Sequence, residues 1–214
     1  MAHQYNVAIF GGSFNPPTIG HIKVAEAVID QMRIPIKDTN DYSRIHQVIF
    51  IPCDKHAFDK ELVRGRLRHN MLDIGIWKSK YGSKFDVSDI EIDTRTEGKT
   101  FNTLMGFKER NSQSKFYCVI GMDCALEIEK WYNWKELINT FPFIVAPRKG
   151  YKPDPIYNWF DNPPHIVLKM EDVDVDYSST EAREAIKKHD EELMRKYLYE
   201  DIIKYIESEG LYSI

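Results

Sequence analysis

Thr18 and His21 follow a glycine turn and have the side chains that could bind a phosphate group. The chain turns at Gly11 and Gly12 after an apolar run, and a helix-like pattern begins near Thr18. Glycine lets a ligand approach the main chain, and a helix start offers unpaired N–H groups and a positive dipole end. Residues three apart share one helical face, so an imidazolium at His21 would stabilise charge on the bound phosphate. Without the Gly-x-Phe-x-Pro before it, a Thr-x-x-His pair would more simply indicate a surface histidine.

A second cluster, near the C-terminus, combines hydroxyl groups with a guanidinium. Ser179 or Thr180 is expected to cap a helix, and Arg183 lies one turn inside it. Arginine matches phosphate geometry with two parallel hydrogen bonds. We therefore expect His21 and Arg183 to face one triphosphate, with an ordinary helix cap as the alternative for the second cluster.

A third group of polar and aromatic residues lies in the middle of the chain. Gly121 and Asp123 end an apolar run, and Trp131 and Trp134 follow. Ligands collect at the carboxyl ends of strands in open α/β sheets, so Asp123 is a candidate contact. Trp131 is expected either to stack on a flat heterocycle or to belong to the core, whereas Trp134 is expected in the core.

Alternating strand-like and helix-like segments must position these groups. Apolar runs predict strands, and apolar residues at three- and four-residue spacing predict helices. Strand–helix alternation predicts an α/β fold, a Rossmann-like open, mostly parallel sheet flanked by helices, in a single domain over 1–214. The expected strands are 7–10, 47–52, 116–120, 143–146 and 165–168, the expected helices are 18–32, 61–77, 180–188 and 200–207, and 147–164 is expected to be a long irregular loop.

Composition and charge exclude several other classes of protein. The 214 residues are 43% hydrophobic with a net charge of −4, which argues against disorder and against a nucleic-acid-binding protein. We read no transmembrane helix and no secretory signal, so a cytoplasmic protein without membrane contacts is expected. Three scattered cysteines indicate free thiols rather than a zinc site. The acidic residues over 171–176 alternate with valine, which predicts a strand with a solvated face and no protein-held metal.

The two end motifs resemble those of the nucleotidylyltransferase superfamily. Its G-x-F-x-P-x-[H/T]-x-x-H pattern is met from Gly12 to His21. The segment from Tyr177 to Arg183 is similar to I-S-S-T-x-I-R, with Tyr177 and Ala182 replacing the two isoleucines. The resemblance implies the nucleotidylyltransferase fold, catalysis without a covalent enzyme intermediate, and Mg²⁺ held mainly by ATP phosphates and water. It implies catalytic roles for His21, Thr18 and Arg183, and ATP contacts for Gly11, Gly12, Ser13, Phe14, Thr18, His21, Gly121, Asp123, Ser179, Thr180 and Arg183.

The middle of the chain resembles bacterial nicotinate mononucleotide adenylyltransferases. Their G-x-D, W-x-x-W and R-x-G-Y stretches are similar to segments starting at Gly121, Trp131 and Arg148. The resemblance implies that Asp123 binds ribose hydroxyls and that Trp131 packs on the pyridine ring. Further substrate contacts that it implies are Thr100, Lys60 and Arg148, with Lys55 as a weaker candidate for the phosphate. Arg68 resembles the family arginine that follows the lysine segment.

Taken together, the resemblances imply transfer of the adenylyl group of ATP to a pyridine mononucleotide. Lys99 replaces a tyrosine of the family, so both nicotinate and nicotinamide mononucleotide stay open as acceptors. A related transferase acting on phosphopantetheine or phosphocholine, and a nucleotide-sensing module without catalysis, are the alternatives. The oligomeric state and the role of the 147–164 loop are left open by the sequence.

Overall fold

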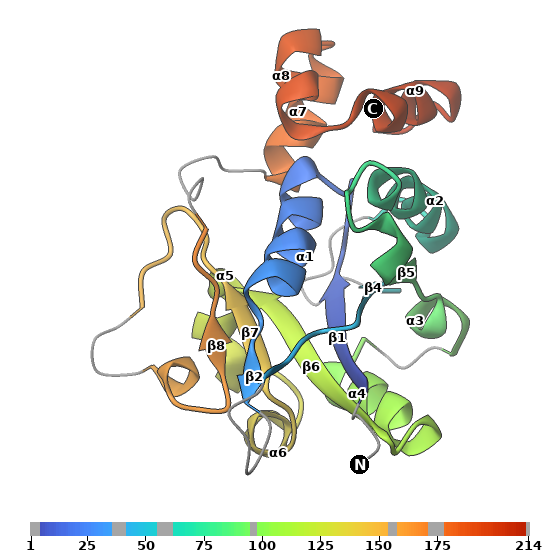
Figure 1. Cartoon of the computed structure of the whole chain (residues 1–214). Helices are drawn as coiled ribbons and strands as arrows, with labels where there is room; N and C mark the ends of the chain where they lie inside the picture. Colours follow the sequence, from blue (N-terminus) through green and yellow to red (C-terminus); the bar gives the residue numbers. More distant parts are fainter. Residues whose placement is uncertain are drawn as a thin grey trace. The chain divides into compact units, whose positions relative to one another are not determined.

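The computed structural model describes residues 5–35, 42–54, 62–94, 98–153, 158–170 and 178–212 (Figure 1). Two compact units make up the chain. The first comprises Met1–Gly11, Ala27–Ile49 and Lys99–Val175, and the second comprises Gly12–Glu26, Phe50–Gly98 and Asp176–Ile214. The single domain expected over 1–214 stays a prediction.

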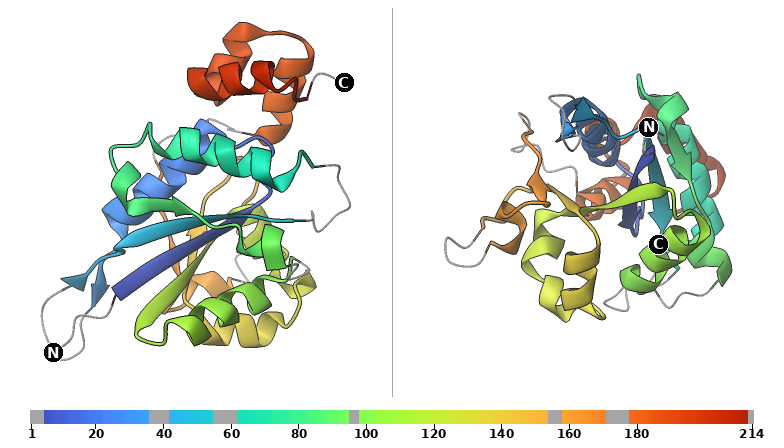
Figure 2. Two further views of the ribbon diagram at one scale, coloured as in Figure 1. Left: turned by 90° about the vertical axis from the view of Figure 1, so that its right-hand side faces the viewer. Right: turned by 60° about the horizontal axis from the view of Figure 1, so that its bottom comes forward.

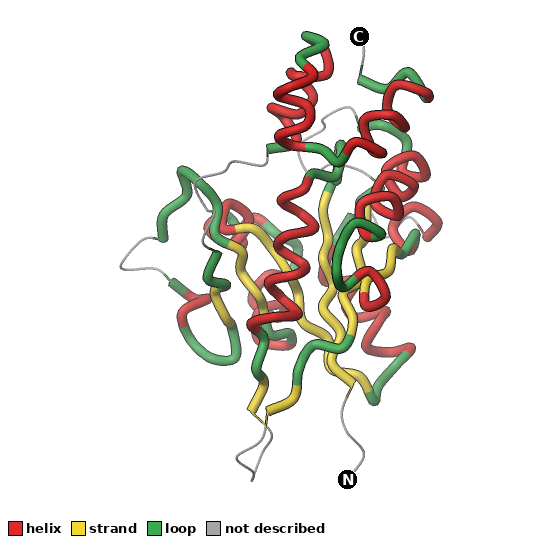
Figure 3. Tube along the Cα trace, turned by 45° about the horizontal axis from the view of Figure 1, so that its top comes forward, coloured by secondary structure: helices red, strands yellow, loops and turns green. Residues whose placement is uncertain are grey.

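A six-stranded sheet forms the framework, with strand order β5-β4-β1-β6-β7-β8. The pairs β1–β6, β6–β7 and β7–β8 are parallel, and the strands run side by side in Figure 3. The expected α/β fold with an open, mostly parallel sheet is confirmed. The strands are β1 (Tyr5–Gly12), β4 (Gln47–Pro52), β5 (Phe85–Val87), β6 (Ser114–Gly121), β7 (Phe143–Ala146) and β8 (Ile166–Val167), and a separate ribbon pairs β2 (Ile34–Pro35) with β3 (Tyr42–Ser43).

The central strands are buried along most of their length, as near-continuous apolar runs predict. All four residues of β7 are buried, and so are five consecutive residues of β1. In the first unit, α4 (Thr100–Arg110) packs on β6, and α5 (Met122–Leu126) packs on β6 and β7. The remaining elements of this unit are η2 (Ile128–Lys130), α6 (Trp134–Thr140) and η3 (Trp159–Asp161).

Helix α1 (Ile19–Gln31) follows the predicted periodicity. Its apolar positions, together with Met32 just beyond its end, are buried: Ile22, Ala25, Val28, Ile29 and Met32. The other helical elements before the C-terminal region are α2 (Gly65–Ile76), η1 (Gly82–Lys84) and α3 (Ile90–Thr94). The predicted start of the second helix, Glu61, lies outside the described residues.

Three helices lie together at the C-terminal end of the second unit (Figure 2). They share one apolar core. They are α7 (Ser179–Lys187), α8 (Glu191–Tyr197) and α9 (Glu200–Ser208). Helix α7 packs on α8, α8 packs on α9, and α9 packs on α2. The core combines Met71 of α2 with Ala182, Ala185, Ile186, Met194, Tyr197, Leu198, Ile202, Ile203 and Ile206.

Two expectations about the first unit need correction. The segment 147–164 is not irregular throughout, because Phe160 is buried and the Trp159 indole N–H donates to the Ala125 carbonyl at 3.0 Å. Large aromatic side chains bury considerable area, so this end of the loop is anchored by packing. Trp134 is only half-buried, since it begins α6 rather than lying inside it. The expected strand over 171–176 lies outside the described residues.

Candidate functional site

The turn between β1 and α1 is shaped by Phe14, whose backbone has a positive φ of 45°. Its ring is 1% exposed and makes an edge contact with His21, with ring centroids 5.0 Å apart. A Cβ on Gly12 would lie 3.0 Å from the Phe14 ring, so a larger residue there would require the ring to shift by a few tenths of an ångström. A Cβ on Gly11 would meet nothing within 4 Å. The left-handed Phe14 is uncommon for a bulky residue and marks a turn held by its surroundings.

Thr18 and His21 are joined by two short contacts that fix the imidazole. The Thr18 backbone N–H donates to His21 Nδ1 at 2.9 Å, and the Thr18 hydroxyl lies 2.8 Å from the same nitrogen. His21 therefore takes the place that Glu or Gln has in a capping box. An atom that accepts from an N–H carries no proton, so the proton of the neutral ring is on Nε2. The locked geometry presents a neutral Nε2–H donor rather than the imidazolium that the sequence suggested.

Thr18 itself is 1% exposed. Its hydroxyl and its N–H are both directed at the His21 ring. It therefore acts on the neighbouring histidine, whose side chain is half-buried.

Arg68 is a buried side chain that bonds the turn between β1 and α1. It is 1% exposed, and its guanidinium donates to the carbonyl oxygens of Val63 at 2.7 Å, Ser13 at 2.6 Å and Cys53 at 2.5 Å. Burial lowers the pKa of Arg68 from its ordinary value. The guanidinium thus ties together the segments that follow β1 and β4 and the one that precedes α2. Arg68, which resembles the family arginine that follows the lysine segment, is a buried structural group here.

The start of α7 packs against the same turn. Ser179 Oγ donates to the Pro16 carbonyl at 2.8 Å, and Arg183 Nη1 donates to the Asn15 carbonyl at 2.6 Å. The two clusters at opposite ends of the sequence are therefore brought together, both within the second unit. Each of these two carbonyls precedes a proline, so the peptide group that contains it has no N–H. The hydrogen bonds that these carbonyls accept come from side chains of α7.

The helix cap is Ser178, and the expectation of Ser179 or Thr180 was wrong. Ser178 has an extended backbone, and its hydroxyl accepts from the N–H groups of Thr180 and Glu181. This is the usual reach of an N-cap serine to the second and third helical residues. The two hydroxyls that follow are left to contact the turn and Arg183.

Arg183 keeps one edge of its guanidinium available. Nη1 donates to Asn15 and, at 3.2 Å, to the Ser179 carbonyl, and Nη2 donates to Thr180 Oγ1 at 3.1 Å. Among the residues that the structure describes, Nε and the second Nη2 hydrogen have no acceptor. That pair of hydrogens has the spacing for two parallel bonds to a phosphate.

In the first unit, Asp123 and Arg148 form an ion pair at the carboxyl ends of β6 and β7. One oxygen of Asp123 bonds Arg148 Nη1, and the other lies where a Cβ on Gly121 would be. Gly121 is thus the residue that lets the carboxylate fold back over the strand end. Arg148 also lies over the Tyr151 ring, 5.6 Å from its centroid.

Thr100 and Trp131 belong to segments that lie side by side. Thr100 is the first residue of α4, and its neighbour Phe101 contacts the Tyr132 ring with centroids 6.3 Å apart. Lys99 Nζ lies 4.9 Å from the same ring centroid. Trp131 precedes Tyr132 and is half-buried. The first turn of α4 and the tryptophan segment therefore form one polar and aromatic cluster.

A profile of the cytidylyltransferase-like family matches residues 9–185, most of the chain. The chain belongs to the cytidylyltransferase-like family. A probable nicotinate-nucleotide adenylyltransferase of Caldicellulosiruptor saccharolyticus is 30% identical over 219 residues, covering 97% of this chain and 98% of that protein. The structure of Plasmodium falciparum nicotinic acid mononucleotide adenylyltransferase complexed with NaAD is 29% identical, covers 98% of both chains and has a TM-score of 0.76. A second structure of that enzyme, complexed with APC, is 28% identical over 98% of both chains, with a TM-score of 0.75.

In this family member, sequence reasoning missed the residues that hold the turn in place. Ser178 had a visible signal, since serine before a helix-forming run is a common cap. Asn15 had none, because its importance comes from distant partners. Lys55 and Lys60 lie outside the described residues, so their expected phosphate contact stays a prediction.

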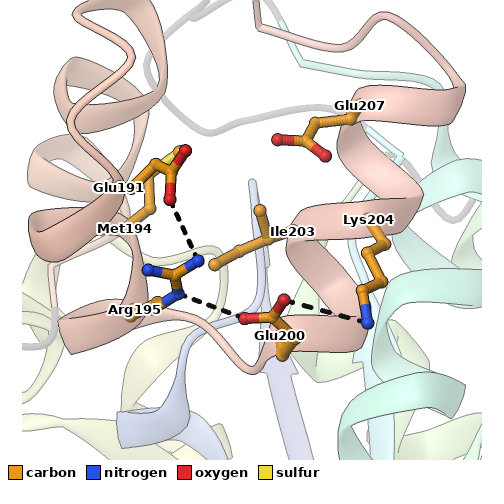
Figure 4. A pocket seen from close by; sticks show the side chains of 7 residues that line it. All are labelled: Glu191, Met194, Arg195, Glu200, Ile203, Lys204 and Glu207. Atoms are coloured by element: carbon orange, nitrogen blue, oxygen red, sulfur yellow. Dashed lines mark hydrogen bonds and ion pairs between the residues drawn. The ribbon is translucent and has the colours of Figure 1, made fainter.

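No cluster of three His, Cys, Asp or Glu side chains suited to a metal occurs in the described part of the chain. None of the described helices has both the length and the apolar character needed to span a bilayer. A hollow of about 160 Å³ lies between α8 and α9 (Figure 4). Its charged side chains bond one another, as Arg195 pairs with Glu191 and Glu200, and Lys204 also pairs with Glu200. The hollow therefore has no resemblance to the phosphate-facing clusters.

The cysteines are free thiols. Burial raises the pKa of Cys53 to about 11, although the nearby Arg68 opposes the shift. Burial and the charge of Asp123 raise the pKa of Cys124 to about 12. Protonated thiols are poor nucleophiles, so neither group suits covalent catalysis.

Proposed function

We propose that the protein transfers the adenylyl group of ATP to nicotinate mononucleotide and releases pyrophosphate. A phosphate oxygen of the mononucleotide attacks the α-phosphorus of ATP. The bond from that phosphorus to the bridging oxygen breaks, and pyrophosphate carries away the electron pair. The observation that carries this proposal is the joining of the Thr18–His21 pair to Arg183, in a chain whose relatives bear the names of nicotinate-nucleotide adenylyltransferases.

Most residues that bind the triphosphate in this proposal belong to the second unit. His21 donates its Nε2–H to the phosphate under attack, and Thr18 keeps the ring in that tautomer. The open edge of Arg183 binds the phosphates that leave. Gly11, Gly12, Ser13 and Phe14 bring the main chain close to the nucleotide, with Ser179 and Thr180 supporting Arg183. Such preorganised donors stabilise developing charge without a covalent step.

Most residues that bind the pyridine nucleotide in this proposal belong to the first unit. Asp123 accepts from ribose hydroxyls, and its pairing with Arg148 holds the carboxylate in one orientation. Gly121 leaves room for that carboxylate and for the ribose. Trp131 packs on the pyridine ring, beside the first turn of α4, where Thr100 contacts the ring substituent. Lys60 is proposed as a contact of the mononucleotide phosphate.

Mg²⁺ is proposed to arrive with ATP. In this proposal phosphate oxygens and water hold the ion. When bound, the ion neutralises part of the triphosphate charge. The protein groups position the nucleotides, so alignment for in-line attack is their main contribution.

The test is pyrophosphate release with ATP and Mg²⁺ and each of three acceptors: nicotinate mononucleotide, nicotinamide mononucleotide and phosphopantetheine. We expect release with nicotinate mononucleotide, and a kcat/KM at least about tenfold lower with the other two, because acceptor groups are distinguished by buried polar contacts. Equal or higher efficiency with nicotinamide mononucleotide would overturn the choice of acid. ATP binding without release for any acceptor would identify a nucleotide-sensing module instead.

A further inference from the structure

Asn15 is a meeting point of three segments that are far apart in the sequence. It is 4% exposed, and its side-chain oxygen accepts from the Tyr212 hydroxyl at 2.8 Å and from the Val63 N–H at 3.2 Å. Its backbone carbonyl accepts from Arg183. The end of the chain, the segment before α2 and helix α7 therefore all bond one residue of the phosphate-facing turn.

The chain after α9 is shaped to bring Tyr212 to this place. Gly210 has a positive φ of 61°, the usual left-handed end of a helix, and the Leu211 N–H donates to the Ile206 carbonyl at 3.0 Å. Tyr212 also has a positive φ, 66°, which is uncommon outside glycine and asparagine. Its side chain packs on the apolar core of the C-terminal helices. Burial raises the pKa of the phenol well above its ordinary value, so the hydroxyl stays a donor.

We propose that Tyr212, acting through Asn15, is a positioning residue that sets the orientation of Arg183 for ATP. This inference rests on the proposed function. The Tyr212 hydroxyl fixes the Asn15 side chain, and the Asn15 carbonyl in turn receives Nη1 of Arg183. The bond from Nη1 to the Asn15 carbonyl fixes the orientation of the guanidinium, and with it the direction in which the Nε and Nη2 edge points. A bidentate bond to phosphate depends on that direction more than a single bond does.

The Tyr212→Phe variant removes only the hydroxyl, and the ring keeps its packing. We expect KM for ATP to rise about tenfold, with kcat and KM for the mononucleotide within about twofold of wild type, since the loss falls on the orientation of one ATP-binding group. The matched control is Tyr205→Phe in α9, whose hydroxyl accepts from Asn70 at 2.9 Å and has no bond to the turn. It should leave KM for ATP unchanged.

The experiment measures steady-state kinetics. It also measures the dissociation constant of ATP by calorimetry in the absence of an acceptor. An ATP affinity that drops about tenfold in Tyr212→Phe and is unchanged in Tyr205→Phe supports the inference, whichever acceptor proves correct. A double variant with Asn15→Ala should bind ATP as weakly as Asn15→Ala alone, because both changes break one connection. Wild-type affinity in Tyr212→Phe, an equal loss in Tyr205→Phe, or additive losses in the double variant would overturn it. Failure of the wild-type protein to release pyrophosphate would refute the proposed function and leave this comparison to decide the role of Tyr212.

Discussion

Replacing Arg68 with methionine should destabilise the protein strongly. The side chain is almost completely buried and donates to three carbonyl oxygens, so methionine would leave all three without this donor. An unsatisfied buried acceptor costs about 1–3 kcal/mol, so the loss of the donor to three carbonyls sets the scale of the effect. Burial of the guanidinium charge lowers the pKa of Arg68, so the charge itself is costly to bury. Its removal offsets part of the loss of stability. The net loss in free energy of unfolding should therefore be about 3–5 kcal/mol.

Urea denaturation followed by tryptophan fluorescence measures this loss. The matched control is Arg66→Met, two residues earlier in α2, because the Arg66 side chain is 61% exposed and pairs with Asp89 at the surface. An exposed ion pair contributes about 0–1 kcal/mol, so the control should unfold near the wild-type urea concentration. A loss below about 1 kcal/mol for Arg68→Met, with an unchanged dependence on urea, would refute the reasoning.

Three further predictions concern phosphate binding and titration. Arg183→Lys should raise KM for ATP about tenfold or more, since lysine cannot form two parallel bonds to a phosphate. The surface variant Arg195→Lys should leave KM unchanged, and equal KM values for the two variants would contradict this prediction. Cys53 and Cys124 should resist a thiol reagent at pH 8. A pKa of about 11 leaves about one Cys53 thiol in a thousand ionised, and the pKa of Cys124 is higher. Rapid labelling of the folded protein at either position would contradict this prediction. The free energy of unfolding should fall as pH rises above about 9. The native state retains protons on Cys53 and on Tyr117, whose pKa burial raises to about 12, after the unfolded chain has lost them. Urea titrations at pH 8, 9 and 10 would show a constant or rising value if this sign is wrong.

The strands and longer helices could be predicted because their patterns are strong. β4 and β7 have the predicted bounds, and α1 buries the residues that its periodicity indicated. β5 has only three residues, Phe85–Val87, which is too short for a pattern. α8 is seven residues long and mostly charged, although Asp190 provides a cap whose side chain accepts from the Leu193 N–H.

The site was partly predictable for a different reason. The types and spacing of Thr18, His21 and Arg183 indicated phosphate chemistry, and the structure joins their segments within one unit. The tautomer of His21 depends on a backbone N–H, and residue spacing does not encode it. The burial of Arg68 depends on packing between segments far apart in the sequence. Both features decide what the side chains can do, and only the fold reveals them.

The rate of adenylyl transfer in a single turnover tests the proposed role of His21 most directly. His21→Ala removes the Nε2–H donor together with the Nδ1 acceptor of the Thr18 N–H. Excess enzyme loaded with ATP and Mg²⁺ is mixed with nicotinate mononucleotide, and dinucleotide is measured over time. We predict a rate about a hundredfold lower or more, as for other lost preorganised donors, in a variant that is still folded at the assay temperature. A well-folded His21→Ala enzyme with a rate within tenfold of wild type would contradict the account.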